Sequence, residues 1–165
     1  MNPVLEVLAR REDGFHELRT LLMTLELSDR LAARIDPSLP DGALELELDG
    51  PFATPDVPRD GRNLAARALA RALAACAQST DRSVPGVRLR LTKVVPSQAG
   101  LGGGSSDAAA AVALGEALLC PPGGSLEPRE RTALLAGLGA DCAFFADAAD
   151  TGVGLCTGRG ERVDG

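Results

Sequence analysis

Alternation of apolar and polar residues predicts a set of short β-strands. The pattern is clearest at Val87–Val94, where apolar and polar residues alternate as they do in a strand with one buried face. Shorter apolar runs predict four further strands, at Val4–Leu8, Leu21–Leu27, Leu31–Ile35 and Leu44–Leu48. The run at Leu21–Leu27 also fits a helix, but the alternation at its end favours a strand.

Three other segments carry helical patterns. The segment from Asn63 to about Gln78 is rich in helix-forming residues and gathers its apolar side chains on one face. An Ala-rich helix is predicted from about Ser105 to Leu119, and another from Pro128 to Leu138, with proline in the tolerated first turn. We expect Asp141–Gly165 to form loops and short strands. Together these elements indicate an α+β protein.

Composition narrows the picture to one compact domain of 165 residues, 45% of them hydrophobic. Because Trp and Tyr are absent and only 4 Phe occur, the core must consist mainly of small aliphatic side chains. The net charge of -6 argues against a nucleic-acid partner bound by a broad basic face. A small anion bound by local backbone groups remains possible.

Several sequence features concern location. We recognise neither a signal peptide nor an apolar stretch long enough to cross a bilayer, so we expect a cytoplasmic protein without a membrane partner. The four cysteines have no CxxC spacing, which favours reduced, buried thiols over a disulfide framework or a zinc site. A strand begins almost at Met1, and Glu161-Arg162-Val163 could continue further, so we expect a chain truncated at both ends.

The glycine-rich segment between Pro96 and Asp107 carries the clearest chemistry. It joins a predicted strand to a predicted helix and contains four glycines followed by Ser105 and Ser106. Glycine allows sharp turns and close approach of a ligand, and the first amides of a helix lack internal partners and attract anions. The segment therefore predicts a phosphate site, although it matches neither a Walker loop nor the dinucleotide fingerprint. The alternative is a tight turn whose serines only cap the helix.

These residues also carry a resemblance. The segment Pro96–Ala108 resembles the phosphate-binding motif of the galactokinase, homoserine kinase, mevalonate kinase and phosphomevalonate kinase superfamily. Within that superfamily the chain is most similar to the 4-diphosphocytidyl-2-C-methyl-D-erythritol kinase family. Three more stretches resemble that family in the same order, namely residues 2–18, residues 138–145 and residues 158–161.

The resemblance implies the N-terminal domain of the superfamily kinase fold, with helices on one side of a mixed sheet (ribosomal protein S5 domain 2-like) and the C-terminal domain missing. Residues 1–165 would form the ATP- and substrate-binding domain. The implied reaction transfers the terminal phosphate of ATP, with Mg²⁺, to the 2-hydroxyl of a small substrate that carries a cytidine diphosphate group. The protein would be a monomer or homodimer in non-mevalonate isoprenoid precursor biosynthesis.

The resemblance also assigns roles to residues. Asp141 would orient or deprotonate the substrate hydroxyl, whereas its position before an apolar run fits a desolvated base and a helix cap equally well. Phe15 would stack on the cytosine and His16 would hydrogen-bond to it, although a lone histidine after a turn is commonly a surface residue. Asn2 would contact substrate.

The implied ATP-binding set combines the glycine-rich segment with two residues outside it. Asn63 is by position a helix N-cap with a possible contact to adenine or ribose, and Lys93 is by position a solvated strand residue that could lie beside the nucleotide. The full set is Pro96, Ala99, Gly100, Leu101, Gly102, Gly103, Gly104, Ser105, Ser106, Asn63 and Lys93. No protein side chain is assigned as a metal ligand.

One departure from the family pattern affects activity. The family places a lysine two positions before Asn2, where this chain has no residue, and loss of that charge removes stabilisation of the transferring phosphoryl group. One alternative is therefore a catalytically inactive nucleotide-binding fragment. A second alternative is another kinase of the superfamily, of the homoserine or mevalonate type, which would have no cytosine for Phe15 and His16 to bind.

Overall fold

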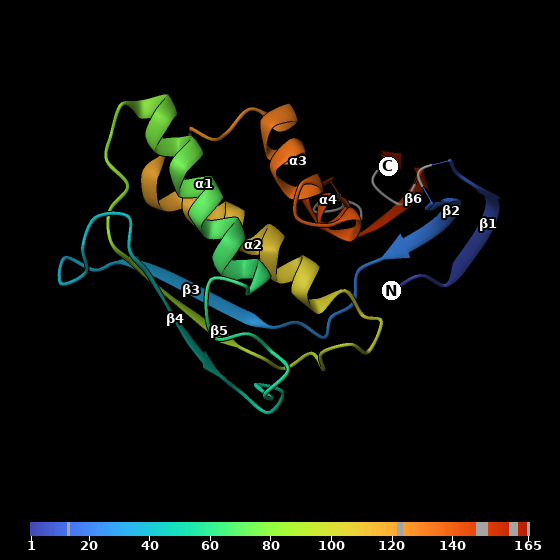
Figure 1. Cartoon of the computed structure of the whole chain (residues 1–165), viewed down its shortest axis with the longest axis horizontal. Coiled ribbons are helices and arrows are strands. Elements are labelled where there is room, and N and C mark those ends of the chain that lie inside the picture. The colour runs from blue at the N-terminus through green and yellow to red at the C-terminus, as the bar shows by residue number, and fades with distance from the viewer. Residues whose placement is uncertain (13, 122–123, 148–151, 159–161, 165) are drawn as a thin grey trace.

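The computed structural model describes residues 1–12, 14–121, 124–147, 152–158 and 162–164. Four strands precede the first helix, and two more strands follow the last helix (Figure 1). In chain order the elements are β1 (Val4–Arg10), β2 (His16–Met23), β3 (Arg30–Ile35), β4 (Leu44–Asp49), α1 (Leu64–Thr80), β5 (Val87–Thr92), α2 (Gly103–Leu119), α3 (Pro128–Ala136), α4 (Ala140–Asp147), β6 (Val153–Gly158) and β7 (Arg162–Asp164).

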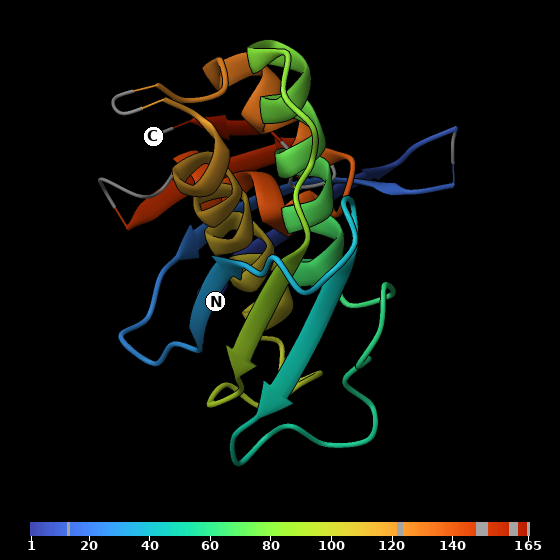
Figure 2. The ribbon, with the colours of Figure 1, turned by 90° about the vertical axis from the view of Figure 1, so that its left-hand side faces the viewer.

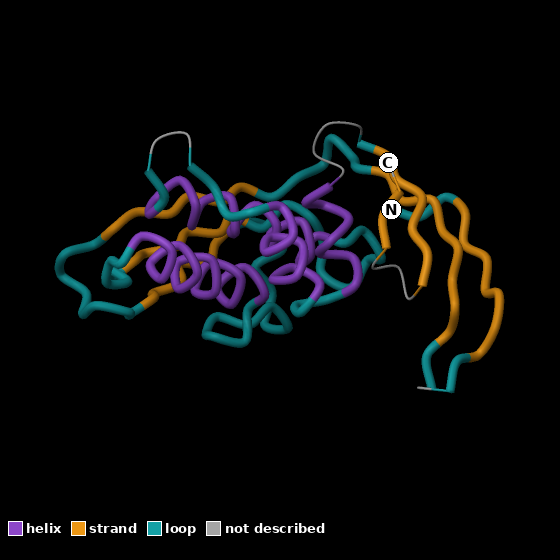
Figure 3. The backbone as a smooth tube through the Cα atoms, turned by 90° about the horizontal axis from the view of Figure 1, so that it is seen from above, coloured by secondary structure: helices purple, strands orange, loops and turns teal. Residues whose placement is uncertain are grey.

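The strands form two sheets. The smaller sheet has the order β3-β5-β4 and is mixed, because β3 runs antiparallel and β4 parallel to β5. Figure 1 shows α1 and α2 together on one side of this sheet, so the predicted α+β class with helices on one side of a mixed sheet is confirmed. The larger sheet, β1-β2-β6-β7, is antiparallel, and its β1–β2 hairpin projects from the helical body (Figure 2 and Figure 3).

The central strand β5 explains why the helices cover one face of the smaller sheet. Its alternate residues Val87, Leu89 and Leu91 are fully buried, whereas Arg88 and Arg90 point to the other face and pair with acidic residues of the neighbouring strand β4. The period of two in the sequence thus places one apolar face against α1 and α2.

Helices α1 and α2 pack closely because small residues meet at their crossing. A Cβ atom added to Gly115 of α2 would lie 2.7 Å from the Cβ of Ala72 of α1, well inside normal contact distance. The surrounding core is built from Ala, Leu and Val, as the composition predicted. In Figure 1 the N-termini of both helices lie at the same end of the smaller sheet.

Two segments differ from the sequence expectations. Residues 24–27 were predicted to continue a strand, but β2 ends at Met23, where its ladder with β6 also ends. The region after Asp141 was expected to contain loops and short strands, but Ala140–Asp147 is a helix. Its apolar residues Cys142, Ala143 and Phe144 are fully buried. Tertiary packing on both faces leaves this helix without an amphipathic pattern.

The cysteines agree with the expectation of free thiols. Cys76, Cys142 and Cys156 are buried and Cys120 is half-buried, and none forms a disulfide. Although 44 residues apart, Cys120 and Cys76 have their sulfur atoms 3.0 Å from each other, a proximity that sequence spacing does not reveal. In the described part of the chain, no helix combines the length and apolar character needed to span a bilayer.

Candidate active site

The glycine-rich segment forms the turn between β5 and α2. Gly100 and Gly102 have positive φ angles of 71° and 69°, a left-handed conformation that glycine adopts without steric cost. Helix α2 begins at Gly103, two residues earlier than predicted, and its N-cap Gly102 provides no side-chain cap. Serine capping of the helix is therefore not observed, because the Ser106 hydroxyl donates instead to the Gly103 carbonyl at 2.9 Å. The first amides of α2 remain available to a ligand.

A cavity of about 450 Å³ opens beside this turn. It brings the turn together with Asn63, at the start of α1, and Lys93, just after β5. The predicted ATP-binding residues that line it are Pro96, Ala99, Gly100, Leu101, Gly102, Gly103, Gly104, Ser105, Asn63 and Lys93. Ser106 lies apart from them and lines a neighbouring cavity of about 170 Å³. The predicted set is thus almost entirely one surface, formed by segments distant in sequence.

Asn63 is the N-cap of α1, as predicted. Its side-chain oxygen accepts a hydrogen bond from the Ala65 amide at 3.0 Å, and its Nδ2 donates to the Pro58 carbonyl at 2.9 Å. The residue is only 5% exposed. Asn63 therefore fixes one wall of the cavity, and its contact to adenine or ribose stays a prediction.

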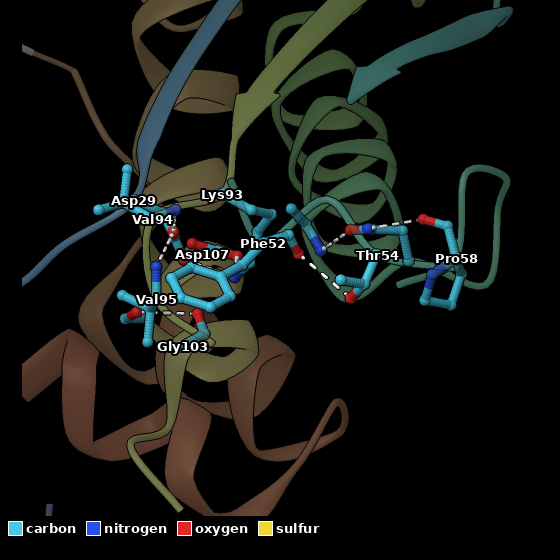
Figure 4. Close-up of polar contacts among 12 residues, drawn as sticks. Asp29, Phe52, Thr54, Pro58, Lys93, Val94, Val95, Gly103 and Asp107 are labelled. Carbon is cyan, nitrogen blue, oxygen red and sulfur yellow. Dashed lines mark hydrogen bonds and ion pairs between the residues drawn. The ribbon is translucent and has the colours of Figure 1, made fainter. Parts of the chain in front are cut away.

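Lys93 is buried, which corrects the expectation of a solvated strand residue. Its ammonium donates to Asp107 at 2.9 Å and to Asp29, and the three side chains are at most 5% exposed (Figure 4). Burial by itself lowers the pKa of Lys93, but the hydrogen bonds to Asp29 and Asp107 outweigh it and raise that pKa. Lys93 is therefore a buried, charged residue in the lining of the cavity.

The two carboxylates beside Lys93 have opposite pKa shifts. Burial raises the pKa of Asp107 to about 7, although its hydrogen bond to Lys93 opposes the shift. Burial also acts on Asp29, but hydrogen bonds from Lys93 and from the amides of Val95 and Val94 lower its pKa. Sequence reasoning placed Asp107 in the first turn of a helix without a functional role and gave Asp29 none.

Helix α4 packs against the glycine-rich turn. A Cβ atom added to Gly102 would lie 3.2 Å from the Phe145 ring, and the Cys142 thiol hydrogen-bonds with Ser105. Asp141 precedes Cys142 in the first turn of α4 and is exposed, so the expectation of a desolvated carboxylate is wrong. Cys142, its neighbour in the chain, nevertheless contacts Ser105 of the glycine-rich turn.

The predicted substrate-binding residues lie elsewhere. Asn2 is exposed and follows Met1, whose backbone pairs with Met23. Met1 lines the 170 Å³ cavity, which shares Leu101 and Gly103 with the larger one. Phe15 and His16 are exposed at the tip of the β1–β2 hairpin and line neither cavity. Of the matching stretch 158–161, residues 159–161 lie outside the described residues.

Comparison with known proteins matches residues 63–149 to the family described as GHMP kinases N terminal domain. A relative from Methylacidiphilum infernorum, named 4-diphosphocytidyl-2-C-methyl-D-erythritol kinase, is 40% identical over 162 residues, covering 98% of this chain and 50% of the relative. One of the same name from Deinococcus radiodurans is 40% identical over 164 residues, covering 99% and 48%. The chain thus spans about half the length of the curated relatives it matches.

Solved structures of the same superfamily also resemble this chain. A crystal structure of 4-(cytidine 5'-diphospho)-2C-methyl-D-erythritol kinase superposes with a TM-score of 0.71 and 37% identity, covering 99% of this chain and 51% of that one. Mevalonate kinase from L. major superposes with a TM-score of 0.53 at 14% identity, covering 83% and 41%, which shows a shared fold alone.

Proposed function

Because this chain belongs to the GHMP kinase N-terminal domain family, we propose that it binds ATP at the glycine-rich turn and serves ATP-dependent phosphorylation of a small alcohol. The substrate that we propose is 4-diphosphocytidyl-2-C-methyl-D-erythritol, phosphorylated on its 2-hydroxyl. Relatives at 40% and 37% identity carry that substrate in their names, whereas likeness to mevalonate kinase extends only to the fold. Residues 1–165 would together form the ATP- and substrate-binding domain.

The observation that carries the proposal is the position of the predicted nucleotide residues around one cavity. Free amides at the start of α2 and the helix dipole favour a polyanion at Gly102–Gly104. A Cβ atom at Gly103 would lie 3.0 Å from the Val95 side chain, so glycine lets the start of α2 pack directly against the residues that follow β5. Lys93, whose ammonium is paired with Asp29 and Asp107, lies on the same surface.

The chemistry follows from positioning. Bound ATP would supply the phosphoryl group, and Mg²⁺ would neutralise part of the charge on the phosphates. The turn would orient the phosphates, and Asp141, exposed on the helix that packs against the turn, would accept or orient the proton of the attacking hydroxyl. Phe15 would stack on the cytosine and His16 would hydrogen-bond to it at the exposed hairpin tip.

Ligand-dependent thermal shifts test this function. The chain is heated with Mg²⁺ and a non-hydrolysable ATP analogue, and separately with a cytidine diphosphate compound, mevalonate or homoserine. We expect stabilisation by the ATP analogue and by the cytidine diphosphate compound only. Stabilisation by mevalonate or homoserine instead would indicate another kinase of the superfamily. Binding of both expected ligands, with no phosphoryl transfer when ATP replaces the analogue, would indicate a nucleotide-binding fragment.

A further inference from the structure

Asp29 occupies the junction between the two sheets. It lies in the segment that connects β2 of the larger sheet to β3 of the smaller sheet and directly precedes β3. The last residue pair of the β3–β5 ladder is Arg30 with Thr92. Asp29 therefore stands where the ladder would next pair with Lys93, although 64 residues separate the two in sequence.

The Asp29 carboxylate replaces the missing rung of that ladder. One oxygen accepts hydrogen bonds from the amides of Val94 at 2.5 Å and Val95 at 2.8 Å, and the other accepts from the Lys93 ammonium (Figure 4). The Asp29 side chain is 1% exposed. One buried carboxylate thus fixes three consecutive residues at the exit of β5, with charge-assisted hydrogen bonds of the strong class.

The residues that Asp29 holds are in contact with the first turn of α2. Atoms of Val95 and the Lys93 ammonium lie 3.0 Å and 3.4 Å from the position of a Cβ on Gly103, the first residue of the helix. Lys93 also contacts Asp107 in the next helical turn. Asp29 itself does not line the cavity, so any effect on a ligand must pass through these residues.

From these contacts we infer that Asp29 is a positioning residue of the nucleotide site, which holds the β5 exit so that the first amides of α2 face the phosphates. The inference rests on the proposed ATP-binding function. The inference can be distinguished from a simple charge effect. Removal of the negative charge of Asp29 should, by charge alone, tighten the binding of a triphosphate. A weaker complex after that removal identifies lost geometry.

Asp36 provides a matched control. It directly follows β3 at the opposite end from Asp29 and is also a buried aspartate, with its side chain 8% exposed. It accepts hydrogen bonds from the Ser38 amide at 3.1 Å, the Ser38 hydroxyl at 2.7 Å and Arg88 at 3.1 Å. Its loss should reduce stability through a comparable set of contacts without touching the β5 exit.

The experiment measures the Kd of a non-hydrolysable ATP analogue with Mg²⁺ by calorimetry, at a temperature where every variant is folded by circular dichroism. We expect Asp29→Ala to weaken binding about tenfold or more, because all three hydrogen bonds that hold the β5 exit are lost. Asp36→Ala should stay within about twofold of the unchanged chain, since it leaves the β5 exit intact. Asp29→Asn keeps the side-chain size but points an NH₂ group at the Lys93 ammonium, so it should weaken binding by a smaller factor.

Unchanged or tighter binding in both Asp29 variants would overturn the inference. If the unchanged chain binds no analogue, the proposed function is contradicted, and amide hydrogen exchange still decides the role of Asp29. Exchange at Ser105 and Ser106, whose amides donate to the Gly102 carbonyl at the start of α2, should then accelerate in Asp29→Ala and not in Asp36→Ala. Equal exchange in the two variants would show that Asp29 does not order the start of the helix.

Discussion

The ring of Phe145 in α4 lies against Gly102, the N-cap of α2, at a distance that leaves little room for a side chain at position 102. This contact fixes the helix that carries Asp141 beside the turn that we propose to bind phosphate. The conformation of Gly102 therefore affects both the proposed phosphate-binding turn and the position of Asp141.

Substitution of Gly102 should therefore reduce stability. Gly102→Ala places a Cβ at a φ of 69° and 3.2 Å from the Phe145 ring, and we expect a loss of about 1–2 kcal/mol in the free energy of unfolding, the usual cost of a strained left-handed residue. Urea unfolding measures the change. Gly104→Ala is the control, since a Cβ there makes an ordinary 3.5 Å contact with Leu64 in a helix. A stability loss of equal size in both variants would contradict the prediction.

The crossing of α1 and α2 gives a second prediction. Gly115→Ala should destabilise the chain by about 1–3 kcal/mol, because the new methyl group overlaps Ala72 in a closely packed core. Ala72→Gly in the same chain should recover part of that loss, giving a favourable coupling energy in a double-mutant cycle. Additive effects of the two substitutions would show that the helices can separate freely at this point.

Asp107 gives a prediction for pH dependence. Its pKa is about 7 in the folded chain, against an ordinary value of 3.8, so the folded carboxyl keeps a proton that the unfolded chain has lost. Its contribution to stability is fully present below the ordinary value and is lost as the pH rises through about 7. Asn cannot lose a proton in this way. The melting temperature of Asp107→Asn relative to the unchanged chain should therefore rise from about pH 5 to about pH 8.

Thermal melts of the two proteins across that range provide the measurement. The pKa of Asp29 is lowered, so its own contribution is lost only in acid and does not interfere near neutral pH. A melting-temperature difference that is constant with pH would show that Asp107 titrates like an exposed aspartate.

We predict that the tip of the β1–β2 hairpin binds cytosine and does not contribute to ATP binding. Phe15 is 54% exposed, so Phe15→Ala should leave the melting temperature nearly unchanged. We expect it to weaken a cytidine diphosphate ligand about tenfold, as loss of aromatic contact with a base commonly does. The Kd of the ATP analogue should not change. Phe52→Ala is the control, because Phe52 is also partly exposed but belongs to the smaller sheet region. Equal loss in both variants would exclude a specific role for Phe15.

Sequence periodicity predicted most elements of the fold because their buried faces follow simple repeats. The alternation at Val87–Leu91 and the small-residue face of Leu64–Thr80 both correspond to single buried surfaces. Periodicity missed α4, since its residues contact the turn on one side and β-sheet residues on the other. Phe144 packs with Leu22 and Cys156, and Phe145 with Gly102.

The candidate site was predictable where it is local in sequence and not where it depends on distant partners. The glycine-rich turn and the Asn63 cap follow from residue types alone. The pairing of Lys93 with Asp29 was not predictable in this way. The pairing of β3 with β5 brings Asp29 next to Lys93, and this pairing is not visible in the local sequence. Phe15 and His16 were assigned by resemblance, and their role remains a prediction.

Amide chemical shifts of the chain, recorded during titration with Mg²⁺ and a non-hydrolysable ATP analogue, test the central claim most directly. The account predicts that the largest changes occur at residues 100–106, with smaller ones at Asn63 and Lys93 on the same cavity. Saturable changes confined to another surface, or no changes at millimolar ligand, would contradict it.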